Sequence, residues 1–192
     1  MNVKDAIQAR RAYRALEPIT IDDDTMRELA GAAGLMCSCY NNQPWRFVFA
    51  RGTEALARVR EGINKGNEWT HRASLVIAAF AKREQDCLIK EREYYLFDLG
   101  MAVGSLLLRA TELGLVAHPI AGFDPGRVKE ALGIPDENML IALIIVGKKN
   151  DDLDGLSPWQ AEAEAQRPER LPLENIYSVD AFDERLNLKA GK

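Results

Sequence analysis

The sequence lacks both the long hydrophobic runs and the cationic excess that would mark two broad classes of protein. Its longest apolar stretches, residues 75–81 and 139–147, fall far short of the roughly 20 residues that a membrane-spanning helix requires. The 25 Lys and Arg residues are outnumbered by 29 Asp and Glu residues, which gives a net charge of -4. Because recognition of a phosphate backbone needs a concentrated positive surface, we expect no membrane segment and no nucleic-acid partner.

Cysteine and histidine are also scarce, with three and two residues respectively. Three cysteines cannot all pair within one chain, and nothing before Val3 looks like a signal peptide, so we expect a reducing cytoplasmic location. Cys37 and Cys39 lack a second ligand pair, and His71 and His118 lie far away in sequence. The sequence therefore disfavours a zinc site, and we expect no metal.

The 192 residues are 47% hydrophobic, which is enough for one substantial core. Helical spacing and apolar runs alternate along the chain, so we expect a single domain over residues 1–192. Helices are predicted over residues 3–11, 22–35, 54–63 and 91–113, and strands over residues 46–50, 75–81 and 141–146. The run at 75–81 has no polar alternation, which is typical of a strand buried on both faces.

Two segments predict contacts beyond one compact core. Residues 91–113 are apolar on nearly every helical face, so we expect burial on all sides. Gly100 and Gly104 would allow close approach of another backbone, either within the chain or in a second copy. Residues 148–192 form a polar, acidic tail without a core of its own, and its scattered apolar side chains predict docking onto another surface.

Five segments carry residues suited to binding an anionic, planar ligand. Arg10, Arg11 and Arg14 end the first predicted helix, where alone they would most often be solvated. The segment 37–45 reads Cys-Ser-Cys-Tyr-Asn-Asn-Gln-Pro-Trp, and Asn67, with one amide donor and one acceptor, precedes the apolar run at 75–81. Residues 117–124 read Ala-His-Pro-Ile-Ala-Gly-Phe-Asp, and Arg170 opens an Arg-Leu-Pro-Leu segment.

In order and spacing, these segments resemble the signature of the FMN-dependent nitroreductase family. The resemblance spans residues 10–176. It implies an α+β fold with a mainly antiparallel sheet flanked by helices, in a homodimer that exchanges C-terminal tails. It also implies one FMN per subunit, bound at the interface. Competing motifs for dinucleotides, phosphate loops or serine hydrolases are absent from the sequence.

The resemblance also implies a role for each segment. Arg10, Arg11 and Arg170 are expected to hold the FMN phosphate, and Arg14 to lie near the N1–C2=O edge of the flavin. Asn67 is expected at the N3–C4=O edge. The loop that contains Cys37, Ser38, Cys39 and Asn41 would cover the ribityl chain and the flavin ring of the other subunit. Its cysteines are expected to be packing groups. The flavin face would meet Pro119, Ile120, Ala121 and Gly122, with a backbone N–H at the glycine directed to N5.

The implied activity is transfer of electrons from NAD(P)H to nitroaromatic, quinone or similar acceptors by a ping-pong mechanism, with no catalytic side chain. Among the departures from the family pattern, Ala12 replaces a serine, and Ala121 stands where some members have glutamate. These departures keep open an alternative, an FMN-binding protein with little turnover that serves in flavin storage, sensing or fragmentation. His118 is open to two interpretations, a proton donor or a structural residue.

Overall fold

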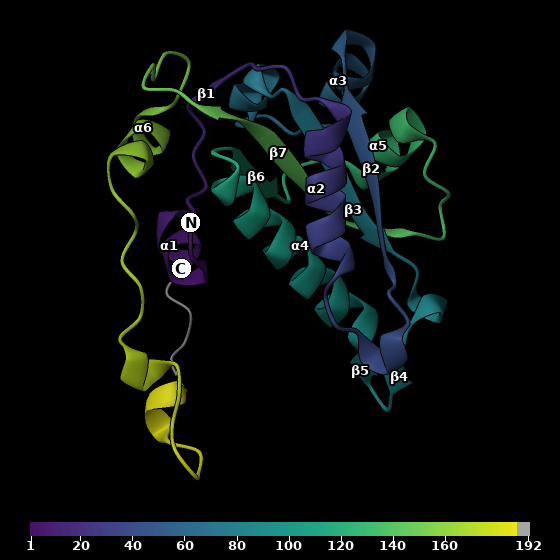
Figure 1. Cartoon of the computed structure of the whole chain (residues 1–192), viewed down its shortest axis with the longest axis vertical. Helices are drawn as coiled ribbons and strands as arrows, with labels where there is room; N and C mark the ends of the chain where they lie inside the picture. Colours follow the sequence, from purple (N-terminus) through teal and green to yellow (C-terminus); the bar gives the residue numbers. More distant parts are fainter. Residues whose placement is uncertain (188–192) are drawn as a thin grey trace.

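A five-stranded antiparallel sheet forms the centre of the computed structural model, which describes residues 1–187 (Figure 1). β2 (Trp45–Arg51) pairs with β3 (Leu75–Ala81), and β3 pairs with the long strand β7 (Met139–Lys149). The other edge of β7 holds two shorter strands, β6 (Val116–Ile120) and β1 (Leu16–Glu17). The expected α+β class with a mainly antiparallel sheet is confirmed.

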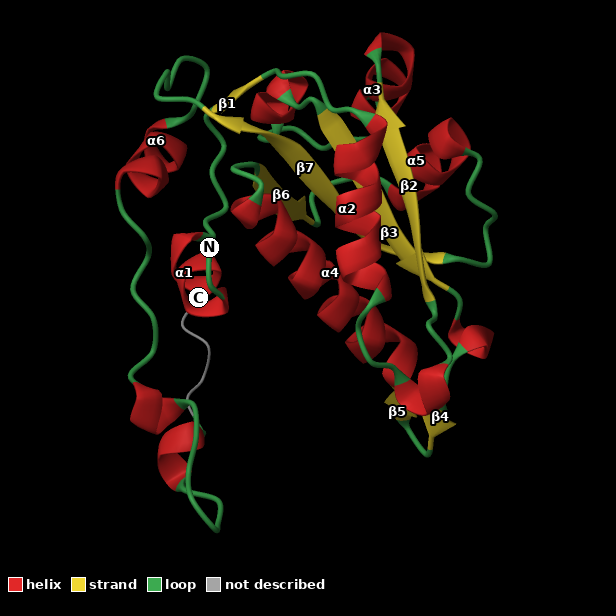
Figure 2. Ribbon diagram, in the orientation of Figure 1, coloured by secondary structure: helices red, strands yellow, loops and turns green. Residues whose placement is uncertain are grey.

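Helices cover both faces of this sheet, as Figure 2 shows. Because strand side chains alternate between faces, Ile77 packs with α2 (Asp23–Gly34) and α4 (Tyr94–Glu112). Val76 packs on the opposite face with α3 (Thr53–Arg60) and α5 (Pro125–Leu132). All seven residues of β3 are buried, which confirms the prediction of a strand covered on both sides.

The predicted helices and strands exist with small shifts at their ends. α1 covers Val3–Ala9, and α2 begins after Asp22, whose carboxylate accepts from the Thr25 backbone N–H at 2.7 Å. This N-cap is the one that the sequence predicts. The sequence did not predict β1, β6, α5, the hairpin of β4 (Leu88–Ile89) and β5 (Arg92–Glu93), or α6 (Pro158–Ala165).

The prediction that the 91–113 helix is buried on all sides is wrong within one chain. One face of α4 is buried on the sheet, whereas Phe97 is 62% exposed. Gly100 and Gly104 have no non-local atom within 4 Å of the position that a Cβ would occupy. The alternative of close packing inside the chain is therefore not supported, and the outer face of α4 lies open.

The described part of the tail has two portions. α6 packs beside the N-terminal segment, and the chain beyond it forms an arm that projects from the molecule (Figure 1). This arm contains the short 3-10 turns Leu173–Asn175 and Glu184–Leu186, and its apolar side chains Leu173, Tyr177 and Phe182 are exposed. Residues 188–192 of the predicted tail lie outside the described residues. No helix within residues 1–187 has the length and apolar character needed to cross a bilayer.

Candidate functional site

Three of the five motif segments meet at the strand β6. His118, within β6, has its ring Nδ1 3.0 Å from the carbonyl oxygen of Tyr13. The same ring stacks on Trp69, with the ring centroids 4.7 Å apart. The fold therefore brings together segments 10–14, 67–69 and 117–122, which the sequence keeps far apart.

The His118 imidazole is neutral in this environment. Burial is the main reason that its pKa falls to about 4, and the nearby cations Arg14 and Arg10 lower it further. A carbonyl oxygen only accepts, so the contact with Tyr13 places the proton of the neutral ring on Nδ1. These properties favour the structural interpretation of His118 over a role as a proton donor.

Asn67 is fixed against the loop that follows β6. Its side-chain amide donates to the Gly122 carbonyl at 3.3 Å, and its carbonyl accepts from the Trp69 indole N–H at 3.3 Å. A Cβ on Gly122 would lie 2.5 Å from Nδ2 of Asn67. The glycine is thus needed for close packing with Asn67, a reason that the sequence did not indicate.

The loop after β6 has a backbone N–H group that makes no hydrogen bond in the described structure. The ladder between β6 and β7 ends at Ile120, and the N–H of Gly122 donates to no acceptor within residues 1–187. Ala121 is exposed, Pro119 is half-buried and Ile120 is buried. Pro119 fits this strand because β6 is paired on one side only, and the missing N–H breaks no bond there.

Arg14 lies between two indole rings. Its guanidinium carbon is 4.8 Å from the ring centroid of Trp159 in α6 and 6.0 Å from that of Trp69. Such contacts stabilise a cation through the negative faces of the rings. Burial lowers the pKa of Arg14, and Glu164 acts in the opposite direction. No side-chain acceptor holds this guanidinium within residues 1–187, so its donors remain available for a ligand.

A cluster of three arginines forms where the tail passes the end of α1. The pKa of Arg10 is lowered by burial and by the charges of Arg167 and Arg170. Arg167 also donates to the carbonyl oxygens of Gln8 and Arg10, at 2.6 and 2.7 Å, and so holds the tail in place. The predicted pair of Arg10 and Arg170 is brought together, while Arg167 was missed by the sequence analysis.

Arg11 has a different position from its two neighbours in the motif. Its guanidinium donates to the carbonyl oxygens of Ala163 and Glu164 at 2.8 and 3.2 Å. These are carbonyls of the last turn of α6, which lack helical partners and carry partial negative charge. In this structure Arg11 therefore fixes α6 against the N-terminal segment, and a phosphate contact would require it to leave those carbonyls.

A cavity of about 290 Å³ adjoins Arg14 and Trp69. Its other walls come from the turn at residues 68–72 and from the loop after β7, at residues 152–156. None of residues 119–122 lines it, so it is separate from the surface at the end of β6.

The motif segment 37–45 lies away from the site at β6. Cys39 of the 3-10 turn η1 (Cys39–Asn41) donates its backbone N–H to Asp98, near the start of α4. The arginine segment lies by α1, which packs near the other end of α4, where the Met1 amino group is 4.0 Å from Glu112. At 1.5 Å per helical residue, Asp98 and Glu112 are about 21 Å apart. Within one chain, Cys37, Ser38, Cys39 and Asn41 therefore do not join the site at β6.

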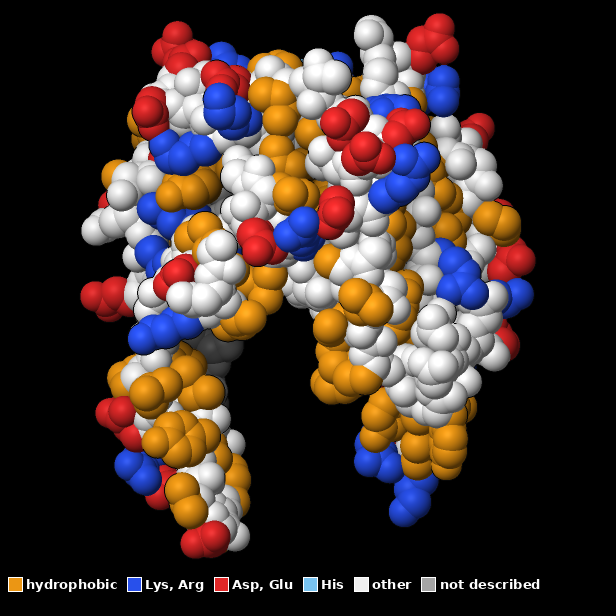
Figure 3. Space-filling view, in the orientation of Figure 1, with side chains coloured by type: hydrophobic (Ala, Val, Ile, Leu, Met, Phe, Trp, Pro, Cys, Tyr) orange, Lys and Arg blue, Asp and Glu red, His pale blue; other side chains and the backbone are white. Residues whose placement is uncertain are grey.

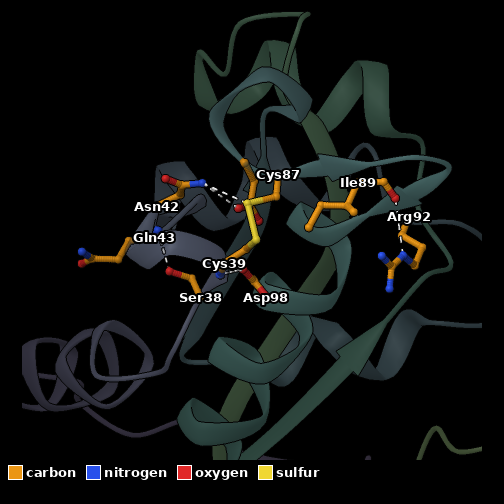
Figure 4. Close-up of a disulfide and its surroundings, with 9 residues drawn as sticks. Ser38, Cys39, Asn42, Gln43, Cys87, Ile89, Arg92 and Asp98 are labelled. Carbon is orange, nitrogen blue, oxygen red and sulfur yellow. Dashed lines mark hydrogen bonds between the residues drawn. A yellow bond between two sulfur atoms is a disulfide. The ribbon is translucent and has the colours of Figure 1, made fainter.

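The resemblance gave these cysteines only a packing role, and the sequence did not predict that Cys39 is bonded to another cysteine. Its sulfur forms a disulfide with Cys87, and the two Cα atoms lie 6.1 Å apart (Figure 4). Cys37 is a free thiol at the surface. Asp86 lies beside the two bonded sulfurs in the described structure. Because these sulfurs are bonded to each other, neither is a thiolate that could bind a metal.

The comparisons with known proteins agree with this geometry. The sequence profile of the Nitroreductase family matches residues 55–148. An uncharacterized 15.4 kDa protein of Mycolicibacterium smegmatis is 33% identical over 114 residues, which cover 59% of this chain and 75% of that protein. An NADH dehydrogenase of Thermus thermophilus is 26% identical over 92% of this chain and 95% of its own length.

A solved structure described as an oxidoreductase containing FMN superposes with a TM-score of 0.83 and is 28% identical. The match covers 95% of this chain and 94% of that one. The profile matches the central part of the chain, the relative of 33% identity matches 59% of it and the fold matches 95% of it, and the protein belongs to the nitroreductase family.

Proposed function

We propose that this protein is an FMN-dependent oxidoreductase that accepts electrons from NAD(P)H and passes them to nitroaromatic, quinone or similar acceptors. The convergence of Arg14, Asn67 and Gly122 at the end of β6 carries this proposal. Family membership and the FMN-containing structural neighbour support the cofactor.

The residues present fit the chemical groups of FMN. Arg10 is a cation destabilised by burial and by two like charges, and a bound dianion would relieve both effects. The Gly122 N–H is a donor without an acceptor in the described structure, and the Arg14 guanidinium has unused donors. The bound flavin supplies the acceptance and release of two electrons, while these residues bind and orient it.

The 37–41 loop contributes to this proposal only in a dimer. It lies far from the arginines of its own chain, so we assign Ser38, Cys39 and Asn41 to the site of a second subunit. The open outer face of α4 and the exposed arm of the tail offer apolar surfaces for such a partner. Figure 3 shows apolar side chains gathered on the arm and around the start of α4, on either side of the hollow between them. An exchange of C-terminal tails belongs to the same proposal.

The function is tested by purification followed by anaerobic reduction. A yellow protein with an absorption band at about 450 nm is expected for oxidised flavin. Stopped-flow mixing with NADH and NADPH should bleach the band, and a nitroaromatic or a quinone should restore it, with parallel lines in double-reciprocal plots for a ping-pong mechanism. A protein that neither contains nor binds FMN would overturn the proposal.

The exposed Ala121, which places no functional group beside the Gly122 N–H, favours a second candidate. An FMN-binding protein with little turnover would bind the cofactor tightly but bleach no faster than free FMN with either nicotinamide. The same stopped-flow experiment thus separates the two candidates.

A further inference from the structure

The disulfide between Cys39 and Cys87 joins two segments that are 48 residues apart. Cys39 belongs to the loop that precedes β2, and Cys87 to the turn that leads into β4. Both cysteines are half-buried, so a small reductant can reach the bond. The link therefore connects a loop of the proposed cofactor site to a surface hairpin through a chemically reversible bond (Figure 4).

The loop held by this bond has an unusual backbone. Tyr40, Asn41 and Gln43 have φ values of 48°, 59° and 49°. This left-handed region is unfavourable for residues other than glycine, so the surrounding contacts must enforce it. Asp98 accepts from the Cys39 N–H at 2.7 Å, the Ser38 hydroxyl accepts from the Gln43 N–H at 2.9 Å, and the Asn42 side-chain amide donates to Asp86 at 3.2 Å. The disulfide to Cys87 adds a covalent restraint to these hydrogen bonds.

Two carboxyl groups flank the bond. Asp98 is 1% exposed, and its pKa is raised, mainly by burial and further by Asp86. Asp86 has one buried carboxyl oxygen without a hydrogen-bond partner in the described structure, and a carboxyl oxygen of Asp86 lies within 4.8 Å of both sulfurs. The disulfide therefore lies beside two carboxyl groups, one of them buried.

We propose that Cys39 and Cys87 form a reversible disulfide–dithiol site that orders or releases the 38–43 loop and thereby controls cofactor binding. The effect on the cofactor rests on the proposed function, whereas the thiol chemistry does not. In the reducing cytoplasm that we predict, disulfides generally have redox-sensing or catalytic roles.

The reductant is a dithiol, and the exchange proceeds in two steps. One thiol of the reductant gives its proton to water, and its thiolate attacks a sulfur of the bond and forms a mixed disulfide, while the other cysteine leaves as a thiolate and takes up a proton from water. The second thiol of the reductant loses its proton in the same way and displaces the remaining cysteine, which also takes up a proton. Two cysteine thiols form, and the reductant becomes a disulfide.

The thiol chemistry is tested in a Cys37→Ser background, which leaves only the two cysteines of the site. The native protein is equilibrated with mixtures of oxidised and reduced dithiothreitol, then quenched with a maleimide reagent that adds mass. We expect two thiols to appear and disappear together without denaturant. Reduction that needs denaturant, or thiols that do not re-form the bond on oxidation, would overturn the proposal.

The response of the loop is measured by hydrogen exchange. Loss of a covalent restraint should accelerate exchange of the Cys39 and Gln43 amides roughly tenfold or more. Cys87→Ser should show the fast exchange in both oxidising and reducing buffer, and amides of β3 serve as the internal reference. Equal exchange in the oxidised and reduced protein contradicts control of the loop. Should Cys87→Ser fail to fold, the reduced Cys37→Ser protein provides the same comparison.

Cofactor coupling is measured by titrating apoprotein with FMN and following flavin fluorescence, with tris(2-carboxyethyl)phosphine as the reductant. We expect reduction to weaken FMN binding about fivefold or more, and Cys87→Ser to show the weak affinity under both conditions. Equal affinities overturn the coupling. A protein that binds no FMN in either state overturns the proposed function instead, and the thiol and exchange measurements still decide the switch.

Discussion

The ring of His118 stacks on the indole of Trp69 at an interplanar angle of 29°, and its Nδ1 lies against the Tyr13 carbonyl. These two contacts hold a neutral imidazole next to the candidate site. Its pKa is 6.5 in the unfolded chain and about 4 in the folded one. Between these values the unfolded state binds more protons, so the free energy of unfolding rises with pH across that window.

We therefore predict that the His118 contribution to stability is fully present above pH 6.5 and is lost as the pH falls towards 4. The loss amounts to about 3 kcal/mol at most. Urea unfolding at pH 7, 5.5 and 4.5 measures it, and His118→Phe, which keeps an aromatic ring, should flatten the dependence relative to wild type. The exposed His71 is the matched control, since His71→Gln should keep the wild-type slope. An unaltered slope in His118→Phe would disprove the assignment.

Arg170→Ala tests the arginine cluster. Charge-assisted contacts to phosphate would be lost, so FMN binding should weaken roughly ten- to a hundredfold. Riboflavin lacks the phosphate, and its affinity should scarcely change. Arg27→Ala, which removes an exposed cation of α2, should leave both affinities as in wild type. If Arg170→Ala weakens FMN and riboflavin equally, or neither, Arg170 is not a phosphate ligand.

Arg14→Ala tests whether this cation favours the anionic reduced flavin. Removal of a nearby positive charge should lower the midpoint potential by roughly 30 mV or more, which corresponds to about 1.4 kcal/mol for a two-electron couple. Dye-coupled reduction measures the potential. Arg72 lines the cavity next to Arg14 and pairs with Asp152, so Arg72→Ala is the control for a general loss of charge. An unchanged potential in FMN-loaded Arg14→Ala would remove this role.

Gly122→Ala tests the close packing at the end of β6. The new methyl group would displace the Asn67 amide and break its bonds to Gly122 and Trp69, which should destabilise the fold by about 1 to 3 kcal/mol. Urea unfolding measures the change. Gly31 lies in α2 with open space around it, so Gly31→Ala should be neutral or stabilising. A second change, Asn67→Ala, should remove most of the penalty of Gly122→Ala, and additive effects would contradict the clash.

Phe97→Asp tests the proposed dimer. This side chain on the open face of α4 would carry a charge into an apolar interface, so the dimer should weaken at least about tenfold in dissociation constant. Sedimentation equilibrium measures it. Leu153→Asp alters an exposed apolar residue of the loop after β7 and should leave the dimer intact. A stable, FMN-loaded wild-type monomer at low micromolar concentration would rule out the obligate dimer.

Local signals made much of this fold predictable. The apolar run Leu75–Ala81 and the N-cap Asp22 act through their immediate neighbours, so their structures follow from short segments. α6 was missed because two of its buried residues, Gln160 and Glu164, are polar. They hydrogen-bond to Gly66 and to the backbone of Arg14, which makes their burial possible. The spacing of hydrophobic residues along a helix cannot predict such contacts.

The candidate site was predictable in its motifs but not in its contacts. The order of the segments pointed to Arg10, Asn67 and Gly122 as parts of one site, and the fold brings Asn67 and Gly122 into direct contact, whereas their binding roles stay predictions. The role of Arg167 depends on how the tail crosses α1, and the pairing of Cys39 with Cys87 depends on the position of the β4 turn. Both are set by tertiary packing between distant segments. The separate position of the 37–41 loop likewise depends on the length of α4.

The contacts that position the arginine segment also determine at which stage of translation the candidate cofactor site can form. β1 pairs with the last residues of β7, and the Arg14 N–H is held by Glu164, 150 residues further along the chain. An emerging polypeptide therefore exposes its N-terminal arginines long before their partners exist. Contacts of such long sequence separation form slowly and late. Assembly of the candidate cofactor site thus has to await the emergence of Glu164 from the ribosome.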